Sequence, residues 1–109
     1  MRIWDIEVSA LCMRHLLGEH RELHATWSII TNNKKGYSSH PEVKRWRGKL
    51  AALYKRHESL VREMKRRGFE HNSPLDKSLA TGSEKQDRFV DTVEEQKLIL
   101  KKKGCLCKV

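Results

Sequence analysis

Two carboxylates and an imidazole recur at helical spacing in the first quarter of the chain. His15, Glu19 and Glu22 stand four and three residues apart, so an α-helix places them along one edge. The neighbouring stripe of the same helix is apolar and consists of Leu16, Leu23, Trp27 and Ile30. Acids at the edge of a buried face lose part of their hydration, which raises their pKa toward the range useful for proton transfer. The spacing indicates acid–base chemistry, with a row of solvated surface charges as the alternative interpretation.

The helix that must position these side chains is expected from about residue 10 to residue 31. Ser9 stands where an N-cap residue belongs. A loop rich in Asn, Gly and Ser follows over residues 32–41 and ends the helix. Gly18 lies inside the helix at a cost of about 1 kcal/mol relative to alanine. We interpret it as a point of close approach by another backbone.

A second helix is expected over residues 42–67, and Gly68 ends it. Its apolar positions follow one another at intervals of four and three residues, which is a strong amphipathic signal. These positions are Trp46, Leu50, Leu53, His57, Leu60 and Met64. His57 therefore occupies an apolar position, and we interpret it as a core or boundary histidine before any role as a ligand.

The last third of the chain contains one more helix. Thr92 and Glu95 form the T-x-x-E pattern of a capping box, which opens a helix over about residues 91–104. Residues 70–90 are polar and irregular, and residues 105–109 form a tail. Strand-type alternation and internal repeats are absent. The sequence therefore predicts an all-α fold, a compact single domain of three main helices whose core comes from about the first 70 residues.

The formal net charge of +9 is concentrated in the middle of the chain. Residues 34–67 carry twelve basic and three acidic side chains, a net of +9. Residues 1–33 have a net charge of −1, and residues 68–109 have a net charge of +1. One strongly basic segment suits a polyanion such as nucleic acid. An anionic membrane surface and an ordinary solvated surface are the alternatives.

Three cysteines do not make the disulfide framework of a small secreted domain. Cys12 is expected to be a small core residue of the first helix. Cys105 and Cys107 stand in the tail, and one such pair cannot complete a tetrahedral zinc site without distant ligands. We expect neither a metal nor another cofactor. A metal-binding or redox role of the tail pair is the weaker alternative.

Uncharged apolar runs are too short to span a bilayer. The chain does not open with a basic region, an apolar region and a cleavage site, so the sequence does not indicate secretion. We expect a monomer in a reduced, cytoplasmic setting, without a membrane partner.

Two blocks of sequence match a known pattern. The first keeps one gapless register over Arg2-Ile3, Val8-Ser9, Leu11, His15-Leu16, Glu19 and Arg21-Glu22-Leu23. The second comprises Tyr54-Lys55, Leu60 and Arg67-Gly68-Phe69. With these residues, roughly 1–30 and 48–70, the chain resembles the pyrimidine-dimer DNA glycosylase family of the phage endonuclease V type. The resemblance implies a compact helical domain with the N-terminal segment between helices.

The resemblance also implies a chemistry. The nucleophile of the family is the α-amino group of the mature chain, and its key acid is the glutamate of the Arg-Glu-Leu motif, here Glu22. Met1 occupies the nucleophile position in register, and the bulky Arg2 generally prevents excision of the methionine. An α-amine has a pKa of about 7.7–8.0, against about 10.4 for lysine, so a useful fraction is neutral near pH 7. It can form an imine with a sugar, and strand cleavage by β-elimination can follow.

Further residues acquire roles from the same resemblance. Arg2 and Arg21 match arginines that contact phosphates, with surface ion pairs as the alternative. His15 matches a histidine of the site, where a structural role is the alternative. The basic face of the second helix is expected to neutralise DNA phosphates, and we single out Arg45, Arg47 and Lys49. The implied function is a DNA repair glycosylase with abasic-site lyase activity on double-stranded DNA that contains a lesion.

Two departures from the phage members bear on specificity. His24-Ala25 replace the proline and arginine that follow Arg-Glu-Leu there. The aromatic, basic C-terminus of the phage members is replaced by Lys-Gly-Cys-Leu-Cys-Lys-Val. These changes leave abasic sites or other damaged bases as substrates. They also keep open the alternative of a non-catalytic nucleic-acid-binding module with the same fold.

Overall fold

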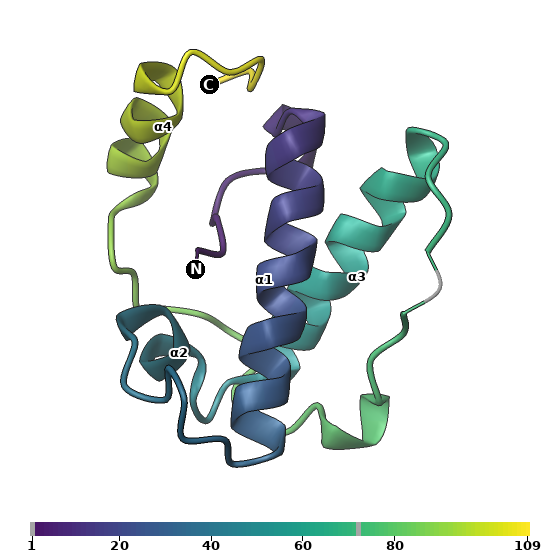
Figure 1. Cartoon of the computed structure of the whole chain (residues 1–109), viewed down its shortest axis with the longest axis vertical. Helices are drawn as coiled ribbons and strands as arrows, with labels where there is room; N and C mark the ends of the chain where they lie inside the picture. The colour runs from purple at the N-terminus through teal and green to yellow at the C-terminus, as the bar shows by residue number, and fades with distance from the viewer. Residues whose placement is uncertain (1, 72) are drawn as a thin grey trace.

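The structure is a computed structural model that describes residues 2–71 and 73–109. Its helices are α1 (Met13–Thr31), α2 (Pro41–Trp46), α3 (Leu50–Arg66) and α4 (Val93–Lys102). Two single turns of 3-10 helix, η1 (Val8–Ala10) and η2 (Lys77–Leu79), complete the list of elements (Figure 1). Over the described ranges the chain forms no strand, only one isolated bridge between Lys49 and Gly82. The predicted all-α single domain is confirmed.

Helix α1 passes between α4 and α3 and packs mainly on α3 (Figure 1). The apolar stripe that the sequence assigned to each helix faces the core between them. Its fully buried members on α1 and α3 are Leu16, Leu23, Leu53 and Leu60. His57 is also fully buried on this face, as the periodicity indicated. None of the helices that the structure describes is long and apolar enough to cross a membrane.

The prediction of one continuous helix over residues 42–67 is wrong. The chain leaves the helical path at Arg47, and Gly48 adopts a φ of +74° before α3 begins at Leu50. A distant segment compensates for the break. The first free N–H groups of α3, those of Ala51 and Ala52, donate to carbonyls of residues 81 and 83 at 2.8 and 3.0 Å. The break is therefore stabilised by backbone groups that follow it by about thirty positions.

Gly82 makes this crossing of two chain segments feasible. Its φ is +84°, and a Cβ built on it would lie 2.1 Å from the carbonyl oxygen of Gly48. A side chain at this position would therefore collide with backbone that the neighbouring hydrogen bonds hold in place. The Ser83 N–H donates to the same Gly48 oxygen at 2.9 Å.

The start of α1 also differs from its prediction. The helix begins at Met13 with Cys12 as its N-cap, and Ser9 lies in the separate turn η1. The approach of another backbone to Gly18 is not observed, because a Cβ there would meet nothing within 4 Å. The capping box at the start of α4 is confirmed, with reciprocal hydrogen bonds between Thr92 and Glu95.

The N-terminal segment, residues 2–7, lies between α1 and α4, as expected (Figure 1). Three backbone groups fix it. The Trp4 N–H donates to a carboxylate on α1 at 3.1 Å, and the Ile3 carbonyl accepts from Arg45 of α2 at 2.8 Å. The Asp5 N–H donates to the Gln96 side chain of α4 at 2.7 Å. Side chains from three helices thus hold this segment inside the molecule.

Candidate active site

A hollow of about 300 Å³ opens where the N-terminal segment, the first half of α1 and the end of α4 meet. Its lining brings together three residues that the sequence placed in the site, namely Arg2, His15 and Glu22. The other lining residues are Trp4, Arg14, Gly18, Glu19, Ile99 and Lys103. Three cationic side chains therefore lie around the same hollow as the Glu22 carboxyl group. This combination suits a ligand that carries phosphates.

Glu22 also borders a second hollow, of about 670 Å³, farther along α1. This hollow is lined by the next turns of α1 and by the loop that follows, with His24, Ala25, Ser28, Ile29, Lys34, Tyr37 and His40. Tyr37 is 72% exposed, so its ring is available to a ligand. The half-buried Glu22 is the residue that the two hollows share.

Glu19, one turn before Glu22, is fully buried and has a different environment. Its two carboxylate oxygens accept from the Arg56 guanidinium at 2.6 and 2.9 Å, and one of them also accepts from the Trp4 N–H. Burial raises the pKa of Glu19, while the Arg56 charge and these hydrogen bonds act in the opposite direction. The residue therefore anchors the N-terminal segment to α1 and α3.

Arg2 and His15 both pack against the ring of Trp4. The Arg2 guanidinium lies 4.9 Å from the centroid of this ring and forms a 2.8 Å ion pair with Asp91. The His15 ring meets the Trp4 ring edge-to-face, with 5.8 Å between centroids. Its Nδ1 atom lies 3.1 Å from the sulfur of Cys12. Arg2 is thus held beside the hollow, and the Nδ1 atom of His15 contacts the sulfur of Cys12.

Arg45 does not have the placement expected of a phosphate contact. Its side chain is 4% exposed, and it donates to Glu42, to Asp5 and to the carbonyl oxygens of Ile3 and Arg88. A guanidinium with this many protein partners has no free donors to offer to DNA. The burial of Arg45 contradicts the expected contact with phosphate and gives the residue a structural role, in which it joins α2 to the N-terminal segment.

The remaining predicted DNA contacts lie away from the 300 Å³ hollow. Arg21 is exposed and borders another surface hollow with His20, His24 and Ser73. Arg47 is exposed in the break between α2 and α3 and donates to the Ser38 carbonyl. Lys49 is only 14% exposed and pairs with Asp87 at 2.6 Å. Of these three, Arg21 and Arg47 offer their charges to solvent.

Met1, the predicted nucleophile, lies outside the described residues. Two cationic residues of the hollow, Arg14 and Lys103, were missed by the sequence analysis. Arg14 stands eight residues before Glu22, and an i, i+8 pair lies about 80° apart around a helix, so helical periodicity could have placed both on one side of α1. For Lys103 the sequence carried no signal, because its place depends on how α4 packs against the N-terminal segment.

Among the residues that the structure describes, two groups of side chains offer atoms that ligate metals. One contains three cysteines and a histidine, and the other contains four histidines: Cys12, His15, Cys105, Cys107; and His20, His24, His57, His71. Burial and the three neighbouring imidazoles of the second group lower the pKa of His20 to about 4. Neither group includes Glu22, but the first group meets the hollow at His15.

The comparison with known families connects this geometry to a function. The family model of pyrimidine dimer DNA glycosylases matches residues 1–77. The chain belongs to the pyrimidine dimer DNA glycosylase family. No curated protein and no solved structure matches it.

The match covers most of the glycosylase fold but not all of the hollow. It includes the N-terminal segment and helices α1, α2 and α3, and it ends at the start of η2. Arg2, His15 and Glu22 therefore lie inside the part shared with the family. The α4 helix, which supplies Ile99, and the following Lys103 lie beyond it. One wall of the hollow is thus built from sequence outside the family match.

Proposed function

We propose that this protein is a DNA repair glycosylase with abasic-site lyase activity, and that the amine of Met1 is its nucleophile. Membership of the pyrimidine dimer DNA glycosylase family supports the glycosylase reaction. The observation that carries the proposal is that Arg2, next in sequence to Met1, lines the same hollow as Glu22. In this proposal the substrate is a pyrimidine dimer or a related lesion in double-stranded DNA.

The proposed reaction has two stages. The neutral amine attacks C1′ of the damaged nucleotide, and the bond between C1′ and the base nitrogen breaks, so that the base leaves with the electron pair and takes up a proton. The amine nitrogen then loses one proton, and its electron pair forms the C1′=N bond as the C1′–O4′ bond of the sugar ring breaks. O4′ takes up a proton, and the product is a protonated, positively charged imine. Glu22 assists these proton transfers, and its negative charge stabilises the positive charge that develops on the sugar.

The second stage follows from the imine. Its positive charge acidifies the hydrogen on C2′, whose loss expels the 3′ phosphate by β-elimination and cuts the strand. Hydrolysis of the imine then frees the amine for another round. Arg2, Arg14 and Lys103 are suited to hold the phosphates beside the reacting sugar. We include Arg21 and Arg47 as more distant phosphate contacts, because both are exposed.

The lesion must leave the base stack before the amine can reach C1′. A dimer weakens stacking and pairing, which lowers the cost of flipping a nucleotide out. The hollow of about 670 Å³ beside Glu22 is large enough for a base, and Tyr37 and His40 on its lining can stack on one. We therefore place a flipped nucleotide there, with its sugar toward Glu22.

Borohydride trapping tests the nucleophile. The protein is mixed with duplexes carrying a thymine dimer, an abasic site or no lesion, and the imine is reduced. We expect a covalent adduct on residue 1 with the first two duplexes and none with the third. An adduct on a lysine would show that another amine is the nucleophile. Binding to all three duplexes without any adduct or incision would instead establish a non-catalytic nucleic-acid-binding module.

A further inference from the structure

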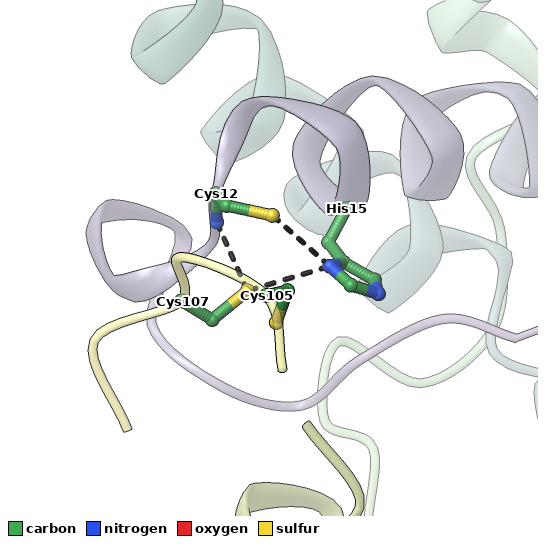
Figure 2. Close-up of side chains that lie close together, drawn as sticks. All are labelled: Cys12, His15, Cys105 and Cys107. Atoms are coloured by element: carbon green, nitrogen blue, oxygen red, sulfur yellow. Dashed lines mark hydrogen bonds between the residues drawn. The ribbon is translucent and has the colours of Figure 1, made fainter. Parts of the chain in front are cut away.

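The tail of the chain places two cysteines at the start of α1, close to a third cysteine and a histidine (Figure 2). We call this set the cysteine–histidine cluster: Cys12, His15, Cys105 and Cys107. Its members are separated by up to 95 positions in sequence, yet their ligating atoms all lie within 4.8 Å of one another. All three cysteines are free thiols, so the cluster is not held by a disulfide.

We propose that the cysteine–histidine cluster binds one structural zinc ion. Three sulfurs and one imidazole nitrogen are a complete tetrahedral donor set for zinc. With bonds of about 2.3 Å to sulfur and about 2.0–2.1 Å to nitrogen, a tetrahedral site has S···N edges of about 3.6 Å. The His15 Nδ1 atom lies 3.1 Å from the Cys12 sulfur and 3.5 Å from the Cys107 sulfur. These two S···N distances are therefore close to the spacing that zinc requires, and the other pairs of ligating atoms lie within 4.8 Å of one another.

The surroundings of the cluster support this assignment. The Cys12 N–H donates to the Cys107 sulfur at 3.0 Å, as a backbone amide does to a thiolate ligand. The Trp4 ring packs edge-to-face against His15 and restricts its orientation. The Lys108 N–H donates to the Ala10 carbonyl at 2.7 Å, which keeps the tail against the start of α1. His15 and Cys107 thus each have a neighbour that fixes their direction.

The proposed ion explains why a single Cys-x-Cys pair suffices in this chain. The distant ligands that such a pair lacks come from the first turn of α1. Zinc binding would fasten the tail, and with it α4, to α1. His15 and Lys103 both line the hollow around Glu22, so the ion would support one wall of that hollow. This last consequence rests on the proposed function, whereas zinc binding itself does not.

A different observation points to a second metal site. We call His20, His24, His57 and His71 the four-histidine cluster, and their ligating nitrogens also lie within 4.8 Å of one another. The Nε2 atoms of His20 and His71 are buried and have no hydrogen-bond partner. Buried polar atoms without partners are rare and call for a missing ligand. Four imidazoles suit zinc, copper or nickel.

The geometry of the four-histidine cluster fits such an ion. The Nε2 atoms of His24 and His57 lie 3.1 Å apart, and the N···N edge of a tetrahedral zinc site is about 3.3 Å. On its other side, the His57 Nδ1 atom lies 3.3 Å from the Glu58 carboxylate, an arrangement that orients a metal-ligating imidazole. We infer that this cluster binds a second divalent transition-metal ion, which links α1, α3 and the segment after α3.

Metal content tests both sites in the full-length protein. The protein is produced with zinc in the medium, and its zinc content is measured by elemental analysis. We expect two zinc ions per chain. Cys107→Ser and His71→Gln serve as controls for each other, because each should lose one ion and keep the other. His40→Gln, which lies in neither cluster, should keep both.

Cobalt distinguishes the two sites spectroscopically. Replacement of zinc by Co²⁺ should give a thiolate-to-cobalt charge-transfer band that disappears in Cys107→Ser and persists in His71→Gln. Chelation of the native protein should lower its thermal midpoint, and added zinc should restore it. These readouts need neither DNA nor activity, so they can fail independently of the proposed function.

Three results would overturn these proposals. Native protein free of zinc after production with the metal would overturn both. A disulfide between two of the three cysteines, found by mass spectrometry under non-reducing conditions, would overturn the first site. If His71→Gln kept both ions, the second site would be excluded. A variant that failed to fold would leave the native protein's metal content and its response to chelation as the decisive measurements.

Discussion

Glu19 and Glu22 stand three residues apart on α1, and the structure uses them in opposite ways. Glu19 lies beneath the N-terminal segment, fully buried against Arg56. Glu22 borders two hollows and is half-buried. The chemical group and the helix are the same, so the difference comes from what covers each turn of α1. A carboxylate that the N-terminal segment covers becomes an anchor, and one that it leaves uncovered is available for chemistry.

The cationic side chains also fall into a buried, anchoring set and an exposed set. Arg56 and Arg45 point into the molecule and bind the acids and carbonyls that hold the N-terminal segment. Arg14 and Lys103 lie around the hollow, and both are exposed. A positive net charge therefore does not by itself mark DNA contacts, because part of it is consumed by buried acids. The following predictions separate the anchoring groups from the groups of the hollow.

The largest effect is expected for Glu22→Gln. Loss of an acid–base group typically lowers the rate about 10²–10⁴-fold, and we expect this decrease in base release from a thymine-dimer duplex. Stability should change by less than about 1 kcal/mol, because Glu22 is half-buried at the border of a hollow. The control is Glu70→Gln, at an exposed site after α3. Equal rates for the two variants would remove Glu22 from the mechanism.

Glu19→Gln should act on stability first. It leaves the Arg56 guanidinium, whose side chain is 16% exposed, without its buried anion, and breaking a pair with a buried member costs up to about 3–5 kcal/mol. Chemical denaturation of the variant measures this loss. Activity should fall as well, because an amide NH2 cannot accept from Arg56, so the side chain that accepts from the Trp4 N–H loses its own support. A variant as stable as the native protein would show that Glu19 does not anchor the N-terminal segment, and would contradict the difference in role between Glu19 and Glu22.

Arg45→Gln should destabilise the fold by about 3 kcal/mol, since Glu42 and Asp5 lose their buried partner. At a temperature where the variant is folded, the salt dependence of its DNA binding should match that of the native protein. A contact to phosphate would instead reduce the slope of log K against log salt by about 1. The slope therefore decides between the structural role and the original DNA-binding interpretation.

Acid pH offers a test of the contacts at the end of α3. Hydrogen bonds from Arg66, outweighing the effect of burial, and from Arg67 lower the pKa of Glu63 from its ordinary 4.5 to about 2. Because the folded protein binds this proton less readily than the unfolded chain, the stabilisation is complete above about pH 5 and is lost as the pH falls toward 2. Arg67 also donates to the Leu11 carbonyl at 2.7 Å and so supports the start of α1.

Glu63→Gln should remove this part of the acid dependence. We expect a loss of about 1–2 kcal/mol at pH 7 that disappears near pH 2, because Arg66 is largely exposed and its pairing is screened. Denaturation at a series of pH values measures it. An unchanged pH profile in the variant would show that the ion pair contributes nothing to stability.

The smallest effects are expected at the edge of the hollow. Arg14→Ala and Lys103→Ala should each weaken DNA binding about 2–5-fold and reduce the salt slope by about 1. Stability should change by less than about 0.5 kcal/mol, because both side chains are exposed. Lys101→Ala, exposed on α4 but not in the lining of the hollow, is the matched control.

Local patterns predicted what depends on neighbours in sequence. Periodicity gave the position of α1 and the buried place of His57, and the capping box gave the start of α4. The break before α3 was missed because it depends on carbonyl groups of residues 81–83, which no local pattern connects to it. Gly48 was the one local signal of that break.

The candidate site also contains residues that the sequence could identify and residues whose roles depend on tertiary packing. Arg2, His15 and Glu22 could be named from the resemblance, and the structure places all three on one hollow. The buried role of Arg45 could not, because it depends on where Asp5 and the Ile3 carbonyl come to lie. The contact between Cys12 and Cys107 likewise could not be predicted, because the tail lies against the start of α1 through tertiary packing and not through sequence spacing.

The bonds that fix the first residues have a consequence for protein synthesis. Arg2 pairs with Asp91, and Asp5 exchanges hydrogen bonds with Gln96. These partners leave the ribosome 89 and 91 positions after residues 2 and 5. An emerging chain therefore lacks these contacts of Arg2 and Asp5 until α4 has been synthesised, although Glu19 and Arg45 are already available to the same segment. The hollow around Glu22 is therefore completed only after α4 has been synthesised, because Ile99 and Lys103 form one of its walls.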